Sequence, residues 1–310
     1  MQLIKPYIQI IDEPDIAKRI EIAARTCYKS EDKITDDSAM KMVKALIKRG
    51  HDSPLEHSNI IVLTRTDKAT IHMRELLTDY EREFGIPHYI RNCGSNNTHA
   101  DYNDYVWSGN LRAWRNIAKR YFGDDIIQVL FSADPLFEDI FVKEHYLTYS
   151  AEELIDCPES DAVCIDCDPE NRDRHKILTV RLVSDRGILA EITRHRLFGI
   201  SAESTRYCRY NSDNGVTYIE PWWFETGTAS DIARFKHILE RNDNDYQTMD
   251  DFDYSSAQKS RAALNQATKS EVVLTGTLEY WKNIVIPLRS SPAAHPDMVR
   301  IINMIEEEME

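Results

Sequence analysis

Residues 194–210 constrain this chain more than any other stretch, because they concentrate positive charge in a strongly acidic protein. They read Arg-His-Arg-Leu-Phe-Gly-Ile-Ser-Ala-Glu-Ser-Thr-Arg-Tyr-Cys-Arg-Tyr, with four arginines and one histidine against the single acid Glu203. The whole chain of 310 residues has a formal net charge of -14. Arginine binds phosphate through two parallel hydrogen bonds and stays charged at every physiological pH. The stretch therefore favours a small ligand with several negative charges, a nucleotide first of all; arginines at a helix end paired with nearby acids are the alternative.

The spacing within this stretch is more specific than its charge. It contains Arg-His-Arg, then seven residues, Ser, one residue and Arg-Tyr. This order resembles the signature of the flavin-dependent thymidylate synthases. Further segments are similar to that family in the same order along the chain: Cys27-Tyr28, residues 50–57 (Gly-His-Asp-Ser-Pro-Leu-Glu-His), Asp185-Arg186-Gly187, residues 191–194, Arg261, Thr275, Trp281, Asn283, Leu288-Arg289 and Ala294-His295-Pro296.

The resemblance spans about residues 22–300, apart from a long insertion, and implies a fold. The expected class is α/β (α+β), a bent and mostly antiparallel sheet flanked by helices. We expect residues 1–310 to form a single domain with an insertion at about 86–174, since a chain of this length can bury one large core. Family members assemble as homotetramers with active sites shared between subunits, and the same is expected here.

The resemblance also implies an activity, the reductive methylation of dUMP to dTMP. Methylenetetrahydrofolate supplies the carbon, and FAD reduced by NADPH supplies the hydride. The protein's share of such chemistry is mainly positioning and electrostatics, because the redox step belongs to the cofactor. The expected partners are thus small molecules, and the protein is expected to be cytoplasmic, with neither a membrane span of ~20 apolar residues nor a signal peptide.

Site residues follow from the resemblance by position. Those expected to bind FAD are His51, Ser53, Arg194, His195, Arg196 and Asn283. Those expected to bind dUMP are Glu191, Arg194, Ala202, Glu203, Ser204, Arg206, Arg261 and Arg289. Arg289 is the expected catalytic residue, because a guanidinium at the uracil ring stabilises negative charge there.

Some of these positions depart from the family pattern. Ala202 offers only its backbone, where many relatives have Glu or Gln. Thr277-Leu278-Glu279 stands where relatives have Asn-Ala-Arg, which changes a cofactor contact. Ser204 is expected to donate a hydrogen bond to the nucleotide and not to act as a nucleophile, because a serine needs an adjacent base and His195 is committed to the flavin.

Three other hypotheses remain open. One is an FAD- and nucleotide-binding protein of the same fold without methylation activity. Another is a nucleic-acid partner that docks through the arginines, which the pI of about 5.2 opposes. The third concerns Cys157, Cys164 and Cys167, with His175 beyond, which could bind zinc; their spacing matches no common finger, so no metal is expected.

Periodicity predicts the secondary structure. Helices are expected at 13–27, 37–49, 67–84, 111–121, 187–197, 228–249, 255–268, 277–288 and 296–309. Strands are expected at 59–66, 176–183 and within 268–275, and a hairpin-like loop between 207–210 and 216–219. Gly50 is expected to end the second helix, and the rest of 86–174 reads as irregular.

Overall fold

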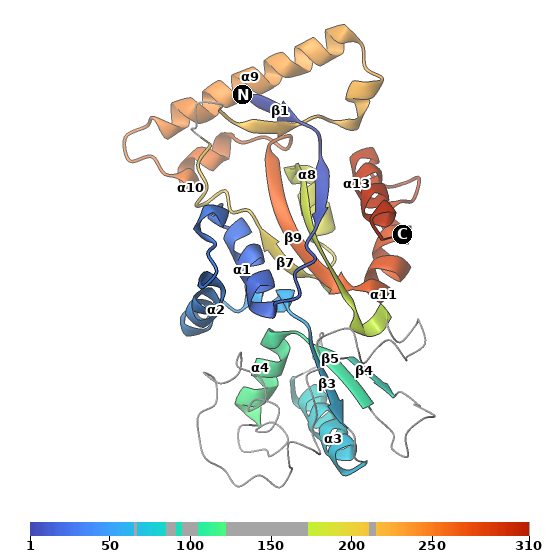
Figure 1. The fold of residues 1–310 in the computed structure, drawn as a ribbon. Coiled ribbons are helices and arrows are strands. Elements are labelled where there is room, and N and C mark those ends of the chain that lie inside the picture. The colour runs from blue at the N-terminus through green and yellow to red at the C-terminus, as the bar shows by residue number, and fades with distance from the viewer. Residues whose placement is uncertain (65–66, 85–90, 95–104, 122–172, 211–214, 310) are drawn as a thin grey trace.

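The computed structural model describes residues 1–64, 67–84, 91–94, 105–121, 173–210 and 215–309 (Figure 1). The strands are β1 Gln2–Ile4, β2 Tyr7–Ile10, β3 Ile60–Thr64, β4 Arg91–Gly94, β5 Tyr105–Gly109, β6 Ile177–Asp185, β7 Gly199–Ala202, β8 Thr217–Ile219 and β9 Lys269–Thr277. The α-helices are α1 Ile16–Thr26, α2 Ser38–Arg49, α3 Asp67–Phe84, α4 Leu111–Arg120, α8 Arg186–Ile192, α9 Ala229–Asp250, α10 Ala257–Ser260, α11 Leu278–Tyr280, α12 Ile286–Arg289 and α13 Pro296–Glu307. The 3-10 turns are η1 Glu31–Lys33, η2 Ser53–His57, η3 Trp222–Glu225 and η4 Arg261–Ala263, and η5 Trp281–Val285 is a π-helical turn.

The central sheet is antiparallel throughout, with strand order β2-β6-β9-β7. Val180, Leu182, Val272 and Leu274 project from one face into a core that also includes side chains of α8, η5 and α13. On the other face Arg181 donates to the hydroxyl of Thr26 at the end of α1. Helices therefore flank both faces, as expected, and the fold class predicted from the sequence is confirmed.

Two smaller sheets lie at opposite ends of this layer (Figure 1). One contains β3, β5 and β4, and α3 and α4 pack near it around a core with Met73, Trp107 and Trp114. The other is the parallel pair β1–β8, which packs under α9.

Several helices begin or end where the sequence indicated. Asp15 caps α1 by accepting from the Lys18 amide at 3.0 Å, and Asn110 caps α4 by accepting from Ala113 at 2.9 Å. Gly50 ends α2 with a φ of 66°, a conformation that glycine adopts without strain. The predicted helices at 13–27, 37–49, 67–84, 111–121, 228–249 and 296–309 are confirmed within a few residues, as are the strands at 59–66 and 176–183.

Other local predictions were wrong. The predicted helix 187–197 ends at Ile192, because the amides of Arg194 and His195 bond back to Glu191 and Ile192 in tighter turns. The strand β7 follows within the signature and was not predicted. Residues 207–210 form no strand, and β8 pairs in parallel with β1, so the expected hairpin does not form.

The C-terminal third departs from prediction in three further places. The predicted helix 255–268 breaks after α10 and η4, and the strand expected within 268–275 is a full nine-residue strand, β9. The predicted helix 277–288 exists, but the π-helical turn η5 interrupts it.

Candidate functional site

The signature is divided by a strand. Within it, β7 pairs with β9, with Gly199 opposite Thr275 and Ala202 opposite Val272. Residues 194–196 precede this strand and residues 204–209 follow it, so the two halves of the signature leave the sheet at opposite ends of the β7–β9 pair. From Glu271 to Gly276 along β9 the backbone spans roughly 17 Å at the usual rise of a strand.

The first half of the signature contributes His195 to a group of four side chains that we call the His195 cluster. Its members are Glu191, His195, Tyr280 and Arg289. Arg289 Nε donates to His195 Nε2 at 2.8 Å, and His195 Nδ1 lies 3.1 Å from the Tyr280 hydroxyl oxygen. Arg289 Nη2 donates to the Glu191 carbonyl oxygen at 3.1 Å, and Nη1 lies 3.5 Å from its carboxylate. Burial, together with the charge of Arg289, lowers the pKa of His195 to about 4. The imidazole is therefore neutral at pH 7.

Arg194 and Arg196 lie on either side of this buried histidine, and both are exposed. The turns that end α8 give successive side chains different directions, so His195 enters the core while its two neighbours remain at the surface. Within the described ranges the Arg194 side chain makes no hydrogen bond or ion pair. Asn283, on η5, is exposed as well.

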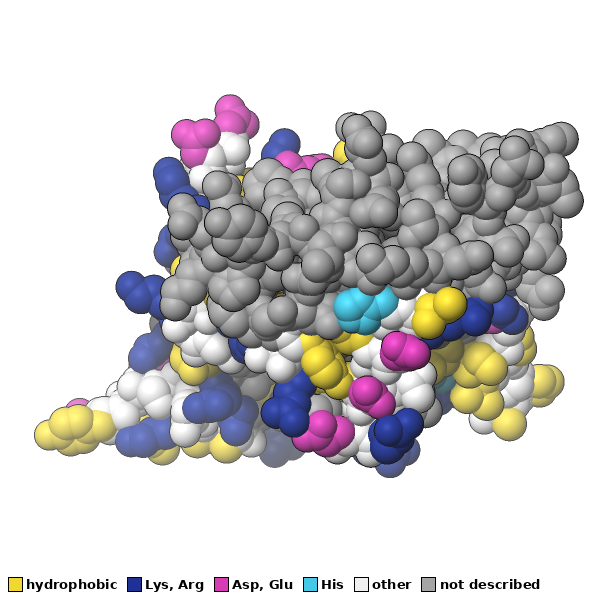
Figure 2. Space-filling model, turned by 90° about the horizontal axis from the view of Figure 1, so that it is seen from below, with side chains coloured by type: hydrophobic (Ala, Val, Ile, Leu, Met, Phe, Trp, Pro, Cys, Tyr) yellow, Lys and Arg dark blue, Asp and Glu magenta, His cyan; other side chains and the backbone are white. Residues whose placement is uncertain are grey.

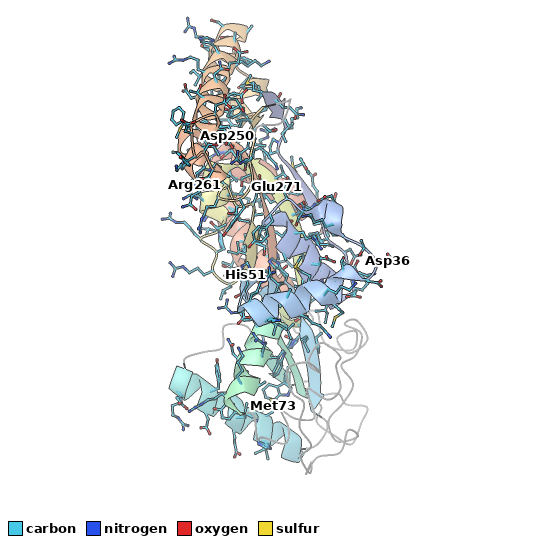
Figure 3. All side chains as sticks on the ribbon, turned by 90° about the vertical axis from the view of Figure 1, so that its left-hand side faces the viewer. Asp36, His51, Met73, Asp250, Arg261 and Glu271 are labelled. Atoms are coloured by element: carbon cyan, nitrogen blue, oxygen red, sulfur yellow. The ribbon has the colours of Figure 1, made fainter. Side chains whose placement is uncertain are left out.

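The second half is a loop, residues 204–209, that lies beside α10. Arg206 Nη2 is 3.5 Å from Gln258 Oε1 on α10, and its guanidinium carbon is 5.6 Å from the ring centre of Tyr207. Arg261 directly follows α10, is exposed, and makes no side-chain hydrogen bond or ion pair with any other described residue. Ser204, partly buried, accepts from the Arg206 amide at 3.4 Å. Arg206 and Arg261 thus lie on neighbouring segments, the loop beside α10 and the turn that follows α10. Figure 3 shows Arg261 between Asp250 and Glu271.

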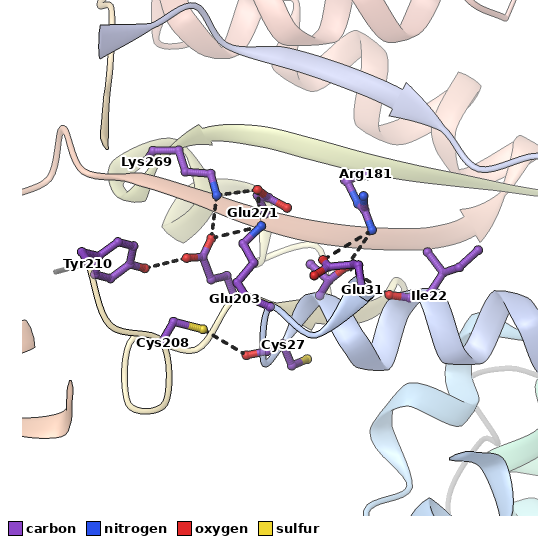
Figure 4. A network of polar contacts seen from close by, with 11 residues as sticks. Ile22, Cys27, Glu31, Arg181, Glu203, Cys208, Tyr210, Lys269 and Glu271 are labelled. Atoms are coloured by element: carbon purple, nitrogen blue, oxygen red, sulfur yellow. Dashed lines mark hydrogen bonds and ion pairs between the residues drawn. The ribbon is translucent and has the colours of Figure 1, made fainter. Parts of the chain in front are cut away.

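The start of this loop is fixed by a buried ion network around Glu203 (Figure 4). One Glu203 oxygen accepts from the Tyr210 hydroxyl at 2.6 Å, and the other lies 3.1 Å from Lys269 Nζ and 3.9 Å from Lys29 Nζ. Both lysines also pair with Glu271. Because both carboxylate oxygens of Glu203 have partners and only 1% of its side chain is exposed, the side chain anchors the loop. A nucleotide contact would have to use its backbone carbonyl, since its amide donates to the Glu271 carbonyl at 2.8 Å.

The end of the loop is fixed to α9. Arg209 Nη1 lies 3.3 Å from Asp250 Oδ2, and Ser260 donates to Asp250 Oδ1 at 2.9 Å. Asp250 is 8% exposed and Ser260 is fully buried. One carboxylate at the end of α9 therefore joins the signature loop to the helix that precedes Arg261 (Figure 3).

The N-terminal motif packs beside β7 through η2. His57 is fully buried, with Nδ1 2.8 Å from the Thr275 hydroxyl and Nε2 2.9 Å from the Ser201 hydroxyl. Burial lowers the pKa of His57 to about 3. His57 is therefore a structural link between η2 and the sheet, and His51 and Ser53, both partly buried, lie near the start of the same turn.

A small pocket opens where η2, β5 and the ends of β6, β7 and β9 meet. Its lining includes Glu56, Asn59, Ser108, Leu197 and Thr277. Burial raises the pKa of Glu56, although its ion pair with Arg112 acts in the opposite direction.

On the face drawn in Figure 2, the cations and carboxylates of the described residues are intermingled.

The sequence profile of a known family matches much of the chain. The family is described as thymidylate synthase complementing protein, and the match covers residues 9–75 and 174–310, which is more than half of the chain. The chain belongs to this family. Both halves of the signature, η2 and the His195 cluster lie within the matched residues.

Solved structures similar to this one include two nucleotide-binding enzymes. One is thymidylate synthase X from Helicobacter pylori with FAD and dUMP, at 16% identity and a TM-score of 0.34, covering 47% of this chain and 73% of that chain. Another is the UMP/dUMP methylase PolB from Streptomyces cacaoi bound with 5-Br UMP, at 19% identity and a TM-score of 0.37, covering 45% of this chain and 69% of that chain. No curated protein matches the sequence. The family assignment therefore rests on the profile match.

The family match leaves residues 76–173 uncovered. The expected insertion at about 86–174 overlaps this range, and its boundaries stay a prediction. Cys157, Cys164 and Cys167 lie outside the described residues. In the part of the chain that the structure describes, no group of three or more His, Cys, Asp or Glu side chains could hold a metal, and no helix is long and apolar enough to cross a membrane.

Of the residues predicted for the nucleotide, Glu191 and Arg289 are in direct contact, and Arg206 and Arg261 lie on neighbouring segments. The structure does not bring these two pairs together in one chain, because β7 separates them. Ala202, partly buried, is the last residue of that strand. Tyr280, Asp250 and Lys269 were not predicted as site residues. Of these, only Lys269 carried a signal, as a charge two residues before Glu271 at the start of an apolar strand.

Proposed function

We propose that this member of the thymidylate synthase complementing protein family methylates C5 of dUMP to form dTMP. The observation that carries the proposal is that two of the arginines predicted for the site have no counter-charge. In a chain with 52 acidic residues, the Arg194 and Arg261 side chains have no acidic partner among the described residues. Exposed arginines without counter-charges suit an anionic ligand.

The nucleotide phosphate is assigned to the loop half of the site. Arg206 and Arg261 supply guanidinium donors from two segments, and the Ser204 hydroxyl supplies a third, neutral donor. Arginine forks match the geometry of phosphate oxygens, and hydrogen bonds to charged groups are the strong ones. We therefore expect these residues to distinguish a nucleoside monophosphate from its nucleoside.

The pyrimidine ring is assigned to Arg289. Its side chain is 18% exposed, and His195 and Glu191 hold it in place. A fixed cation at a uracil carbonyl or ring nitrogen would stabilise negative charge there, which makes C5 more nucleophilic toward the carbon donor. His195, neutral at pH 7, adds no second positive charge there.

The residues assigned to FAD fit an anionic cofactor. Arg194 and Arg196 are exposed cations, and Asn283, His51 and Ser53 are polar side chains that solvent reaches in whole or in part. When bound, a reduced flavin supplies the hydride, with NADPH as the proposed reductant and methylenetetrahydrofolate as the proposed carbon donor. Glu279, paired with Arg174 at 3.1 Å, stands where relatives have a cofactor-binding arginine.

The separation of the two halves supports a shared site. Arg289 follows the C-terminal end of β9, whereas Arg261, with Arg206 on the neighbouring segment, precedes its N-terminal end. We therefore propose that one subunit holds the phosphate and a neighbour presents the ring-binding half. A homotetramer, as expected from the family, supplies such neighbours.

The alternative is a protein of the same fold that binds FAD and nucleotide without methylating. Ala202, Thr277 and Glu279 are the residues that favour it, because they depart from the family pattern. The visible absorption spectrum of the purified protein with added FAD, before and after NADPH, tests the proposal, and calorimetry with dUMP and deoxyuridine tests the ligand. Bound flavin that NADPH bleaches, with dUMP preferred over deoxyuridine, is the expected result; failure to bind flavin would refute it.

A further inference from the structure

We propose that Tyr280 is a positioning residue that fixes the orientation of Arg289 through His195. The inference rests on the proposed function, because that function assigns Arg289 to the pyrimidine ring. Tyr280 lies outside the signature, and its hydroxyl acts on Arg289 only through the histidine between them.

The protons along the Tyr280–His195–Arg289 chain can be assigned. A guanidinium has no acceptor, so the bond between Arg289 Nε and His195 Nε2 requires an unprotonated Nε2. Because His195 is neutral at pH 7, its one proton is on Nδ1 and is donated to the Tyr280 oxygen. The Arg289 donor therefore selects the His195 tautomer, and the Tyr280 oxygen, which accepts from Nδ1–H, fixes the orientation of the ring that accepts from Arg289.

The donors of Arg289 are used unevenly. A guanidinium has five N–H donors. Nε is bonded to His195, one N–H of Nη2 is bonded to the Glu191 carbonyl, and Nη1 faces the Glu191 carboxylate. This leaves one N–H on each terminal nitrogen for a ligand, so the angle at which the remaining pair points is set by the bonds to His195 and Glu191.

The imidazole itself is fixed by an aromatic seat. Tyr280 meets Phe198 edge to face at 5.1 Å between ring centres, and Phe198 lies 4.4 Å from Trp281. Gly276 makes room for this packing, because a Cβ there would lie 2.5 Å from two carbons of the Phe198 ring. The His195 ring lies 6.0 Å from the Phe198 ring and 6.1 Å from the Tyr280 ring, centre to centre, and among the described residues its side chain makes hydrogen bonds to Tyr280 and Arg289.

The π-helical turn η5 sets the angle between Tyr280 and Arg289. Tyr280 directly precedes η5 and Arg289 ends α12, which directly follows it, yet both side chains reach the same imidazole at its two nitrogens. A turn with i→i+5 hydrogen bonds contains more residues than an α-helical turn, so it changes the angular relation of the residues on either side. Such turns are rare and occur frequently at functional sites. Here the turn allows the two side chains to clamp His195.

A purely structural role for Tyr280 makes a different prediction. The ring packs on Phe198 whether or not it has a hydroxyl, and the hydroxyl bonds to His195. Tyr280→Phe therefore keeps the packing and removes only the link in the chain. Tyr218→Phe is the matched control, since Tyr218 is a fully buried tyrosine whose hydroxyl bonds to Asn242 at 3.1 Å in the separate core under α9.

The experiment compares four variants with the wild type. Three are the single variants Tyr280→Phe, Tyr218→Phe and Arg289→Lys, and the fourth combines Tyr280→Phe with Arg289→Lys. The structural readout is the Nε–H resonance of Arg289 by NMR, assigned by its loss in Arg289→Lys. We expect it to shift or broaden in Tyr280→Phe and to be unchanged in Tyr218→Phe. The kinetic readout is dTMP formation, where Tyr280→Phe should lower kcat roughly tenfold while the KM for dUMP changes less than about threefold.

Three outcomes would overturn the inference: an unchanged Arg289 resonance in Tyr280→Phe, an unchanged kcat, or an equal further loss of kcat when Tyr280→Phe is added to Arg289→Lys. The last outcome would show that the two residues act independently, whereas residues that act through one another are not additive. If the wild-type protein forms no dTMP, the proposed function fails. The Arg289 resonance still decides whether Tyr280 positions Arg289.

Discussion

Glu203 and Lys269 form an ion pair of 3.1 Å at the point where the signature leaves the sheet, with only 1% and 13% of their side chains exposed. Lys29 and Glu271 complete the network, so that two carboxylates face two ammonium groups (Figure 4). Burial acts to raise the pKa of Glu271, but the two lysines outweigh it and hold that pKa below its ordinary value. The network keeps the loop start in one conformation.

Glu203→Gln should destabilise the fold, because it removes one charge and leaves two lysines with a single carboxylate. Breaking one side of a buried ion pair costs about 3 kcal/mol or more. Urea unfolding at pH 7 measures the change. Glu240→Gln, at an exposed position on α9, is the control and should change the free energy of unfolding by less than about 0.5 kcal/mol.

His57 should make stability depend on pH. Its pKa in the folded protein is about 3, below the ordinary 6.5, so between these values the folded state binds fewer protons than the unfolded state. The contribution of His57 to the free energy of unfolding is therefore fully present above about pH 6.5. It falls by about 1.4 kcal/mol for each pH unit as the pH drops toward 3. His57→Gln should reduce the slope of unfolding free energy between pH 6.5 and 5 by that amount. Equal slopes in both proteins would contradict the assignment.

Asp250→Asn should weaken the binding of dUMP but not of deoxyuridine. Asp250 joins Arg209 on the signature loop to Ser260 beside Arg261, so losing its charge loosens both segments assigned to the phosphate. We expect the Kd for dUMP to rise roughly fivefold to tenfold by calorimetry. Asp251→Asn, at the next and exposed position, is the control and should bind dUMP like the wild type.

Arg206→Ala and Arg261→Ala should each raise the Kd for dUMP roughly tenfold or more, since a charge-assisted bond to the phosphate is lost. Deoxyuridine, which has no phosphate, should bind each variant as it binds the wild type. Arg234→Ala, an exposed arginine on α9, controls for the loss of charge in general. Equal weakening toward both ligands would mean that the two arginines support the fold.

The sequence predicted the long helices because the residues that specify a helix are close together in the chain. Apolar residues recur at helical spacing in α1 and α2, and Asp15 and Gly50 mark where a helix begins or ends. It did not predict β7, because Gly199 to Ala202 become a strand only by pairing with β9, and it did not predict β1, whose parallel partner β8 lies far along the chain. Long-range pairing leaves little trace in a single segment.

The resemblance predicts Arg194, Arg289 and the other cations as site residues, because their spacing along the chain is itself the signal. It did not reveal that Glu203 is buried between two lysines, or that Tyr280 and Arg289 meet at His195 across a π-helical turn. Those relations depend on the folded arrangement of β9 and η5, and no local pattern encodes them.

The formation of dTMP tests the central proposal most directly. Purified protein with FAD, NADPH, methylenetetrahydrofolate and dUMP should convert dUMP to dTMP, detected by mass spectrometry, and omission of FAD from flavin-free protein should abolish the reaction. Arg289→Lys should form dTMP at least tenfold more slowly with flavin still bound. Bound FAD and dUMP without any dTMP would contradict the proposed activity and leave a protein that binds both ligands without methylating.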